Sequence, residues 1–124
     1  MSVRRLSQLQ WFGLLVGGPV WFAEFLLGLG ESTAQCNPAS ARWGLPHDAI
    51  ELGLTVAGAL VVGASLAASA VVFRRTAGVD EHEASPLGRI HFFAAASVLG
   101  NLVFLAIILE TGIATVFDQA CRQS

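Results

Sequence analysis

The stretch IELGLTVAGALVVGASLAASAVVF, residues 50–73, decides the fold, because after Glu51 it contains no charged residue. A run of roughly 20 apolar residues is long enough to cross a bilayer core of about 30 Å at about 1.5 Å per residue. A helix of a soluble three-helix bundle needs a polar stripe on its outer side, and residues 53–73 have none. We therefore predict a transmembrane helix over residues 50–73.

Two further stretches, residues 11–29 and 92–113, have the same character. The chain is 54% hydrophobic, and only 13% of its residues are charged, about half the usual share for a soluble domain. Because helices satisfy the backbone where water is absent, these stretches predict an all-α integral membrane protein with three transmembrane helices. Its 124 residues are expected to form a single transmembrane domain, residues 1–124.

The arginines predict how the chain is oriented. Five of them flank the start of the first stretch and the loop between the second and third: Arg4, Arg5, Arg74, Arg75 and Arg89. Arg42 and Arg122 lie on the opposite side. The positive-inside rule then places the N-terminus in the cytoplasm and the C-terminus in the periplasm of a bacterial inner membrane.

The two cysteines fall on the same predicted side of the membrane. Cys36 follows the first stretch and Cys121 follows the third. The orientation puts both outside, where disulfides persist, and such a bridge typically contributes about 2–4 kcal/mol. We predict a structural disulfide, with a cysteine pair that carries a metal such as copper, a thiol-exchange pair and two inert thiols as the alternatives.

Each apolar stretch carries one carboxylate, namely Glu24, Glu51 or Glu110. Ionisable groups inside a bilayer are costly and tend to have partners or a task. Glu24 shares a helical face with Gly13 and Gly17, whose small size marks a helix–helix contact, so it is predicted to point into protein. The alternative readings are that Glu51 and Glu110 reach the headgroups and that Glu24 is protonated or hydrogen-bonded.

His47 and Glu51 are four residues apart and so share a helical face. Together with Glu24 and Glu31 they are candidates for an outward-opening metal site or a proton path. This is a weak signal, because such a pair also arises by chance. The alternative is that the carboxylates simply reach the headgroups.

Small and polar residues predict how the helices pack. Ala59, Gly63 and Ala67 recur every four residues, a spacing that allows close helix approach in lipid. Pro19 is expected to kink the first helix, because it cannot donate to the carbonyl four residues before it. Asn101, in the middle of the third stretch, is predicted to form an interhelical hydrogen bond.

The combination of Pro19 and Trp21 in an aromatic-rich first helix with Cys36 and Cys121 resembles a loosely defined group of proteins. These are small bacterial multi-span membrane proteins encoded among caa3-type haem–copper cytochrome c oxidase genes. Glu24 departs from the group, which often has a neutral or histidine-bearing face there. The resemblance implies association with a respiratory oxidase or with its assembly.

No zinc-ligand spacing, nucleophile elbow or phosphate-binding glycine loop is present in the sequence. The net charge of -2, without a basic run, argues against a nucleic-acid partner. We therefore predict a non-catalytic accessory or assembly component without a cofactor, whose partners are the lipid bilayer and either a larger membrane complex or further copies of itself.

Two other functions remain open at this point. The first is a small proton-coupled transporter or channel-like oligomer that uses Glu24. The second is periplasmic-side metal handling by Cys36, Cys121, His47 and Glu51.

Overall fold

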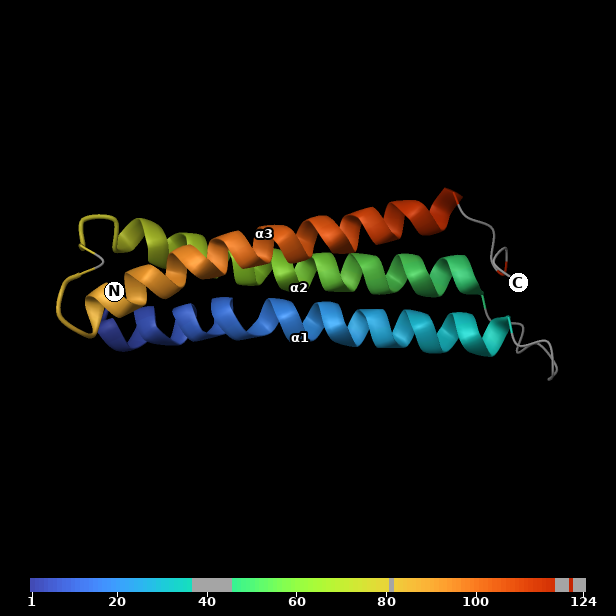
Figure 1. Cartoon of the computed structure of the whole chain (residues 1–124), viewed down its shortest axis with the longest axis horizontal. Coiled ribbons are helices and arrows are strands. Elements are labelled where there is room, and N and C mark those ends of the chain that lie inside the picture. Colours follow the sequence, from blue (N-terminus) through green and yellow to red (C-terminus); the bar gives the residue numbers. More distant parts are fainter. Residues whose placement is uncertain (37–45, 81, 118–120, 122–124) are drawn as a thin grey trace.

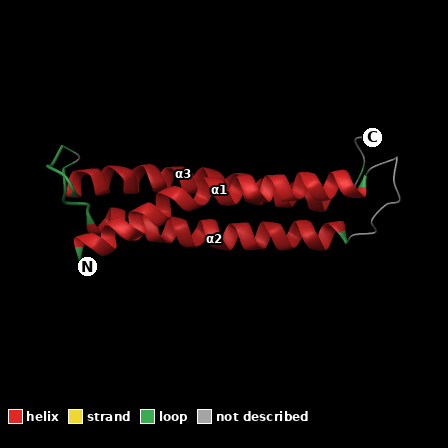
Figure 2. Ribbon diagram, turned by 90° about the horizontal axis from the view of Figure 1, so that it is seen from below, coloured by secondary structure: helices red, strands yellow, loops and turns green. Residues whose placement is uncertain are grey.

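The computed structural model describes residues 1–36, 46–80, 82–117 and 121, and these residues form three helices. The helices are α1 (Val3–Gln35), α2 (His47–Arg75) and α3 (Leu87–Phe117). They run alongside one another in alternating directions, as Figures 1 and 2 show from two sides. The predicted all-α class is confirmed, and each of the three predicted spans falls in a helix that is long and apolar enough to cross a membrane.

The helices extend beyond the predicted spans at both ends. The helix α1 has 33 residues and so measures about 50 Å, well over the hydrocarbon thickness of about 30 Å. Its first turn is capped by Ser2, whose Oγ accepts a hydrogen bond from the backbone N–H of Arg5. Hydropathy locates the apolar part of a helix only, whereas backbone hydrogen bonding and caps determine where the helix ends.

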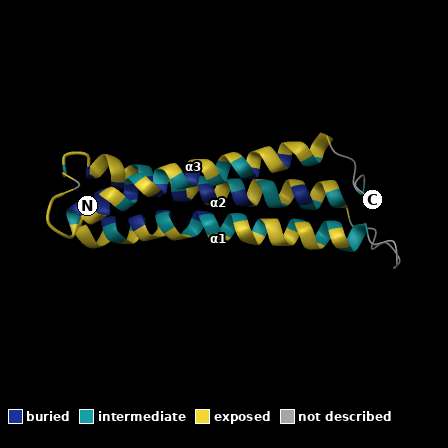
Figure 3. Ribbon diagram, in the orientation of Figure 1, coloured by how far each residue is buried: buried dark blue, intermediate teal, exposed yellow. Residues whose placement is uncertain are grey.

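The three helices bury one narrow face each and leave the rest of their apolar surface outside (Figure 3). A small apolar cluster closes the end of the bundle that contains the start of α1: Leu6, Val72, Ile90 and Ala94. Large side chains such as Leu60 and Val116 are exposed on the outer faces. Such faces are suited to contact with lipid, which is as apolar as leucine.

A polar junction joins all three helices midway along the bundle. Nδ2 of Asn101 in α3 donates to the carbonyl of Gly13 in α1 at 2.7 Å and to Oγ of Ser69 in α2 at 3.5 Å. Oγ of Ser65 donates to the same Gly13 carbonyl at 3.0 Å. Asn101 is 2% exposed, and a Cβ added at Gly17 would overlap its Oδ1. The absence of a side chain at Gly13 and Gly17 therefore makes room for these bonds.

The predicted contact on the second helix is corrected by the structure. Ala67 is exposed, and a Cβ added at Gly63 would meet nothing within 4 Å. The buried face of α2 is formed instead by Glu51, Gly58, Val62, Ser65, Ser69 and Val72. Ala59, Gly63 and Ala67 form a row one residue away from this face, at about 100° to it, where Ala59 and Gly63 are half-buried and Ala67 is exposed.

Pro19, which we also expected among the residues that pack the helices, does not lie on the buried face of α1. It is exposed, and α1 continues as a single helix from Val3 to Gln35. A proline on the outer face removes one backbone hydrogen bond without disturbing the packing on the inner face.

The predicted disulfide is confirmed: Cys36 at the end of α1 is bonded to Cys121, which follows α3. The bridge joins residues 85 positions apart and lies at the end of the bundle where α2 begins. The side of the membrane on which this end lies was predicted partly from Arg42 and Arg122, and these two residues lie outside the described part of the chain.

Candidate functional site

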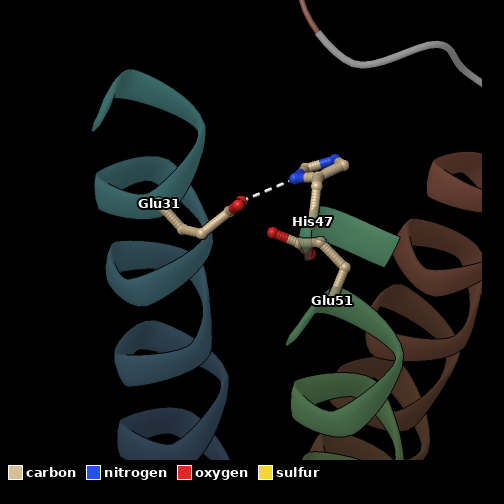
Figure 4. Close-up of side chains that lie close together, drawn as sticks. All are labelled: Glu31, His47 and Glu51. Atoms are coloured by element: carbon tan, nitrogen blue, oxygen red, sulfur yellow. Dashed lines mark hydrogen bonds and ion pairs between the residues drawn. The ribbon is translucent and has the colours of Figure 1, made fainter. Parts of the chain in front are cut away.

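A cluster of two carboxylates and one imidazole lies between α1 and α2, at the disulfide end of the bundle. Nδ1 of His47 is 2.6 Å from Oε2 of Glu31, and Glu51 points toward the same space (Figure 4). One ligand atom from each of these three residues lies within 4.8 Å of the others. The cluster thus unites the predicted pair His47 and Glu51 with Glu31.

Local structure explains why these side chains converge. The helix α2 begins at His47, so His47 and Glu51 stand on adjacent turns of one face. The helix α1 runs antiparallel to α2 and continues to Gln35, which brings Glu31 level with the first turn of α2. A Cβ added at Gly28 would lie 3.1 Å from Oε1 of Glu51, so the glycine leaves the space that this carboxylate occupies.

The cluster is largely shielded from the outside. Glu51 is 9% exposed, and the side chains of Glu31 and His47 are 7% and 13% exposed. Within the described part of the chain, Glu51 has no hydrogen-bond partner. The carboxylate of Glu51 lines a cavity, and a cation bound there would stabilise its negative charge.

Glu24 lies deeper in the bundle than the cluster and points at α2. Its Oε2 is buried against Gly58, where an added Cβ would overlap it, and this atom has no hydrogen-bond partner among the described residues. Glu24 and Glu51 both line a cavity of about 230 Å³. Two carboxylates that share one cavity repel each other when both are charged, and the repulsion is larger than in water because the surroundings are apolar.

Glu110 and Asn101 do not belong to this site. Glu110 is exposed on α3, while Asn101 belongs to the polar junction with Gly13 and Ser69. The three carboxylates singled out from the sequence therefore separate into two that face each other, Glu24 and Glu51, and one that faces outward.

The donor set is suited to a divalent transition metal. Imidazole nitrogen and carboxylate oxygen are common ligands of Zn²⁺, at about 2.0–2.2 Å. Three protein ligands leave a further position for water or another group. Cys36 and Cys121 are bonded to each other, so neither sulfur is available as the thiolate that the metal-handling alternative included.

Sequence reasoning missed two buried polar residues near the opposite end of the bundle, Gln10 and His91. Nδ1 of His91 is 2.8 Å from Oγ1 of Thr76, and its ring stacks on Phe73 with the centroids 5.0 Å apart. Gln10 shares the face of Gly13, three residues away, and that spacing was the signal available for it.

Comparison of the chain with protein-family models, curated proteins and solved structures finds no match.

Proposed function

We propose that the protein is a small, non-catalytic, multi-pass membrane protein that binds a divalent metal cation through Glu31, His47 and Glu51. The observation that carries the proposal is the convergence of their ligand atoms within 4.8 Å of one another. The position of Glu51, which is 9% exposed and lines a cavity, supports it further. A cation between the two helices would place a positive charge beside Glu51, where an unpaired carboxylate is costly.

The site is proposed to face the periplasm of a bacterial inner membrane. Arg4, Arg5, Arg74 and Arg75 lie at the other end of the bundle, which the positive-inside rule assigns to the cytoplasm. The disulfide between Cys36 and Cys121 lies at the same end as the site, and such bridges persist in oxidising compartments. Both arguments favour the same orientation.

Zn²⁺ is the probe of choice for this donor set. Carboxylate and imidazole ligands without a thiolate favour Zn²⁺ and similar divalent ions over Cu(I), which prefers sulfur. Three ligands converge among the described residues, and a site with three protein ligands keeps a position open for water or another group, unlike a closed structural site.

The test is titration of Zn²⁺ into metal-free protein purified in a mild detergent without reductant. We expect about one ion per chain. Glu51→Gln should weaken binding by at least about tenfold, since replacing a residue that only hydrogen-bonds to a metal ligand already lowers the affinity about 10–100-fold. Glu110→Gln is the matched control, because Glu110 is exposed and lies outside the cluster. Absence of stoichiometric Zn²⁺, or equal affinity in the two variants, would refute the proposal.

An accessory role in a larger membrane complex is a second candidate, favoured by the outward row Ala59, Gly63 and Ala67. The space beside Gly63 is open, since a Cβ added there would meet nothing within 4 Å. Small residues in such a row allow the helix of another protein to approach closely. The resemblance to proteins of caa3-type oxidase gene groups makes a respiratory oxidase the proposed complex.

Native mass spectrometry from mild detergent tests the accessory role. Gly63→Leu should remove any co-purifying subunit or second copy without unfolding the chain, because the space beside Gly63 is open. A lone monomer before the substitution would count against this role.

A further inference from the structure

The cavity beside Glu24 combines charge with aromatic walls, and this combination indicates a different ligand from a metal ion. Its volume is about 230 Å³, and it lies between α1, α2 and α3. Glu24 and Glu51 provide carboxylates, Trp21 and Phe25 provide aromatic rings, and Ile108 provides an apolar surface. We propose that this cavity binds a small lipophilic organic ammonium cation, about the size of benzyltrimethylammonium.

The carboxylates account for the charge of the ligand. No arginine or lysine is among the described residues that line the cavity, so the two carboxylates face it without a fixed counter-charge. Oε2 of Glu24 is buried and has no hydrogen-bond partner in the described part of the chain. Quaternary ammonium groups carry a full positive charge and have no N–H to donate, so they can lie beside the carboxylates of Glu24 and Glu51 at the cavity wall without a directed hydrogen bond.

The aromatic rings account for the organic part of the ligand. Trp21 and Phe25 stack with their centroids 6.3 Å apart, and Trp21 also contacts Phe104 at 5.8 Å. These contacts hold the indole in place at the cavity wall. Aromatic faces attract ammonium cations, and quaternary ammonium groups are the best-attested ligands of aromatic cages. A metal ion would make no use of these walls, and a neutral acyl chain would make no use of the carboxylates.

This inference goes beyond the proposed metal site and is separable from it. Glu31 and His47 belong to the metal cluster, whereas Trp21 and Glu24 belong to the cavity. Glu51 is shared by both. Substitutions of His47 and Glu24 are therefore expected to affect different ligands.

The experiment is calorimetric titration of benzyltrimethylammonium into metal-free protein in a mild detergent. Wild-type protein should bind one equivalent, and Glu24→Gln should weaken binding at least about tenfold, because it removes a charge from an apolar site. Glu110→Gln should bind as wild type does, since Glu110 is exposed on the outside of α3. His47→Gln should also retain binding, which separates this result from failure of the metal site.

Trp21→Leu provides a test that leaves every carboxylate in place. We expect it to weaken binding about three- to tenfold, the range of a partly desolvated cation–π contact. Circular dichroism of each variant checks that the helices are retained, and if Glu24→Gln fails this check, the Trp21→Leu result decides. The proposal would be overturned if the wild type did not bind the cation, or if the Glu24→Gln and Glu110→Gln variants bound it equally. Equal binding would indicate that the cavity takes up detergent or lipid through apolar contact alone.

Discussion

Replacement of Asn101 by alanine is expected to destabilise the bundle by about 2 kcal/mol. The substitution removes two hydrogen bonds, to the Gly13 carbonyl and to Oγ of Ser69. Interhelical hydrogen bonds in membranes are worth about 0.6 kcal/mol each on average, which gives about 1.2 kcal/mol. The small cavity left by the amide costs up to about 1 kcal/mol more.

The loss stays moderate because no polar partner is left unpaired. The Gly13 carbonyl still accepts a hydrogen bond from Ser65, and Ser69 still donates to the carbonyl of Ser65 at 2.9 Å. The large cost of an orphaned polar group in an apolar environment therefore does not arise.

Unfolding in mixed micelles of a mild detergent and dodecyl sulfate measures this difference. Leu102→Ala is the matched control, since Leu102 is the next residue along α3 and is exposed. It should change the stability by less than about 0.5 kcal/mol, because lipid tails and leucine are similarly apolar. If Asn101→Ala and Leu102→Ala gave the same stability, the polar junction would not hold the three helices together.

Three further predictions follow from the packing and the site. Gly58→Ala should be less stable than Gly63→Ala by about 1 kcal/mol in the same mixed-micelle assay, because the methyl group added at Gly58 would displace the carboxylate of Glu24, whereas the one added at Gly63 would meet nothing within 4 Å. Replacing Cys36 and Cys121 with serine should lower the stability by at most about 4–5 kcal/mol, the loop-closure value for a separation of 85 residues, and thiol titration of the unfolded wild type should find no free thiol. Zn²⁺ affinity should fall as the pH is lowered, because the metal competes with protons for the carboxylates and the imidazole; an affinity that did not change with pH would contradict coordination by these groups.

The all-helical fold was predictable because each helix contains a long apolar run, which is not expected in the helices of a soluble bundle. Hydropathy alone did not locate the helix ends, since α2 begins at His47 and α3 at Leu87, within polar sequence. Extension of α1 to Gln35 is what brings Glu31 into the site. The predicted spans were therefore right in number but too short to show this contact.

Which face of α2 packs was not predictable from small residues alone. Gly58 and Gly63 are equally small, but only Gly58 meets a neighbouring helix, because Glu24 lies opposite it. That distinction depends on the rotation of α2 relative to α1, which the sequence of α2 does not encode by itself. The sequence did contain one signal for the site: Glu24 shares a helical face with Gly28, and Glu51 shares one with Gly58. In the structure each glycine makes room for the carboxylate of the other helix.

The bond between Cys36 and Cys121 closes a covalent ring that contains α2, α3 and the segments that connect them, while α1 precedes the ring. The chain is synthesised from its N-terminus, so Cys121 becomes available only after α3 has been made. For a chain whose three helices cross a membrane, as their length and composition allow, the ring closes only when both cysteines have reached the same side, after all three helices have been inserted. The oxidised form is a chemical record of completed insertion, and its mobility on a non-reducing gel distinguishes finished molecules from those still lacking the last crossing.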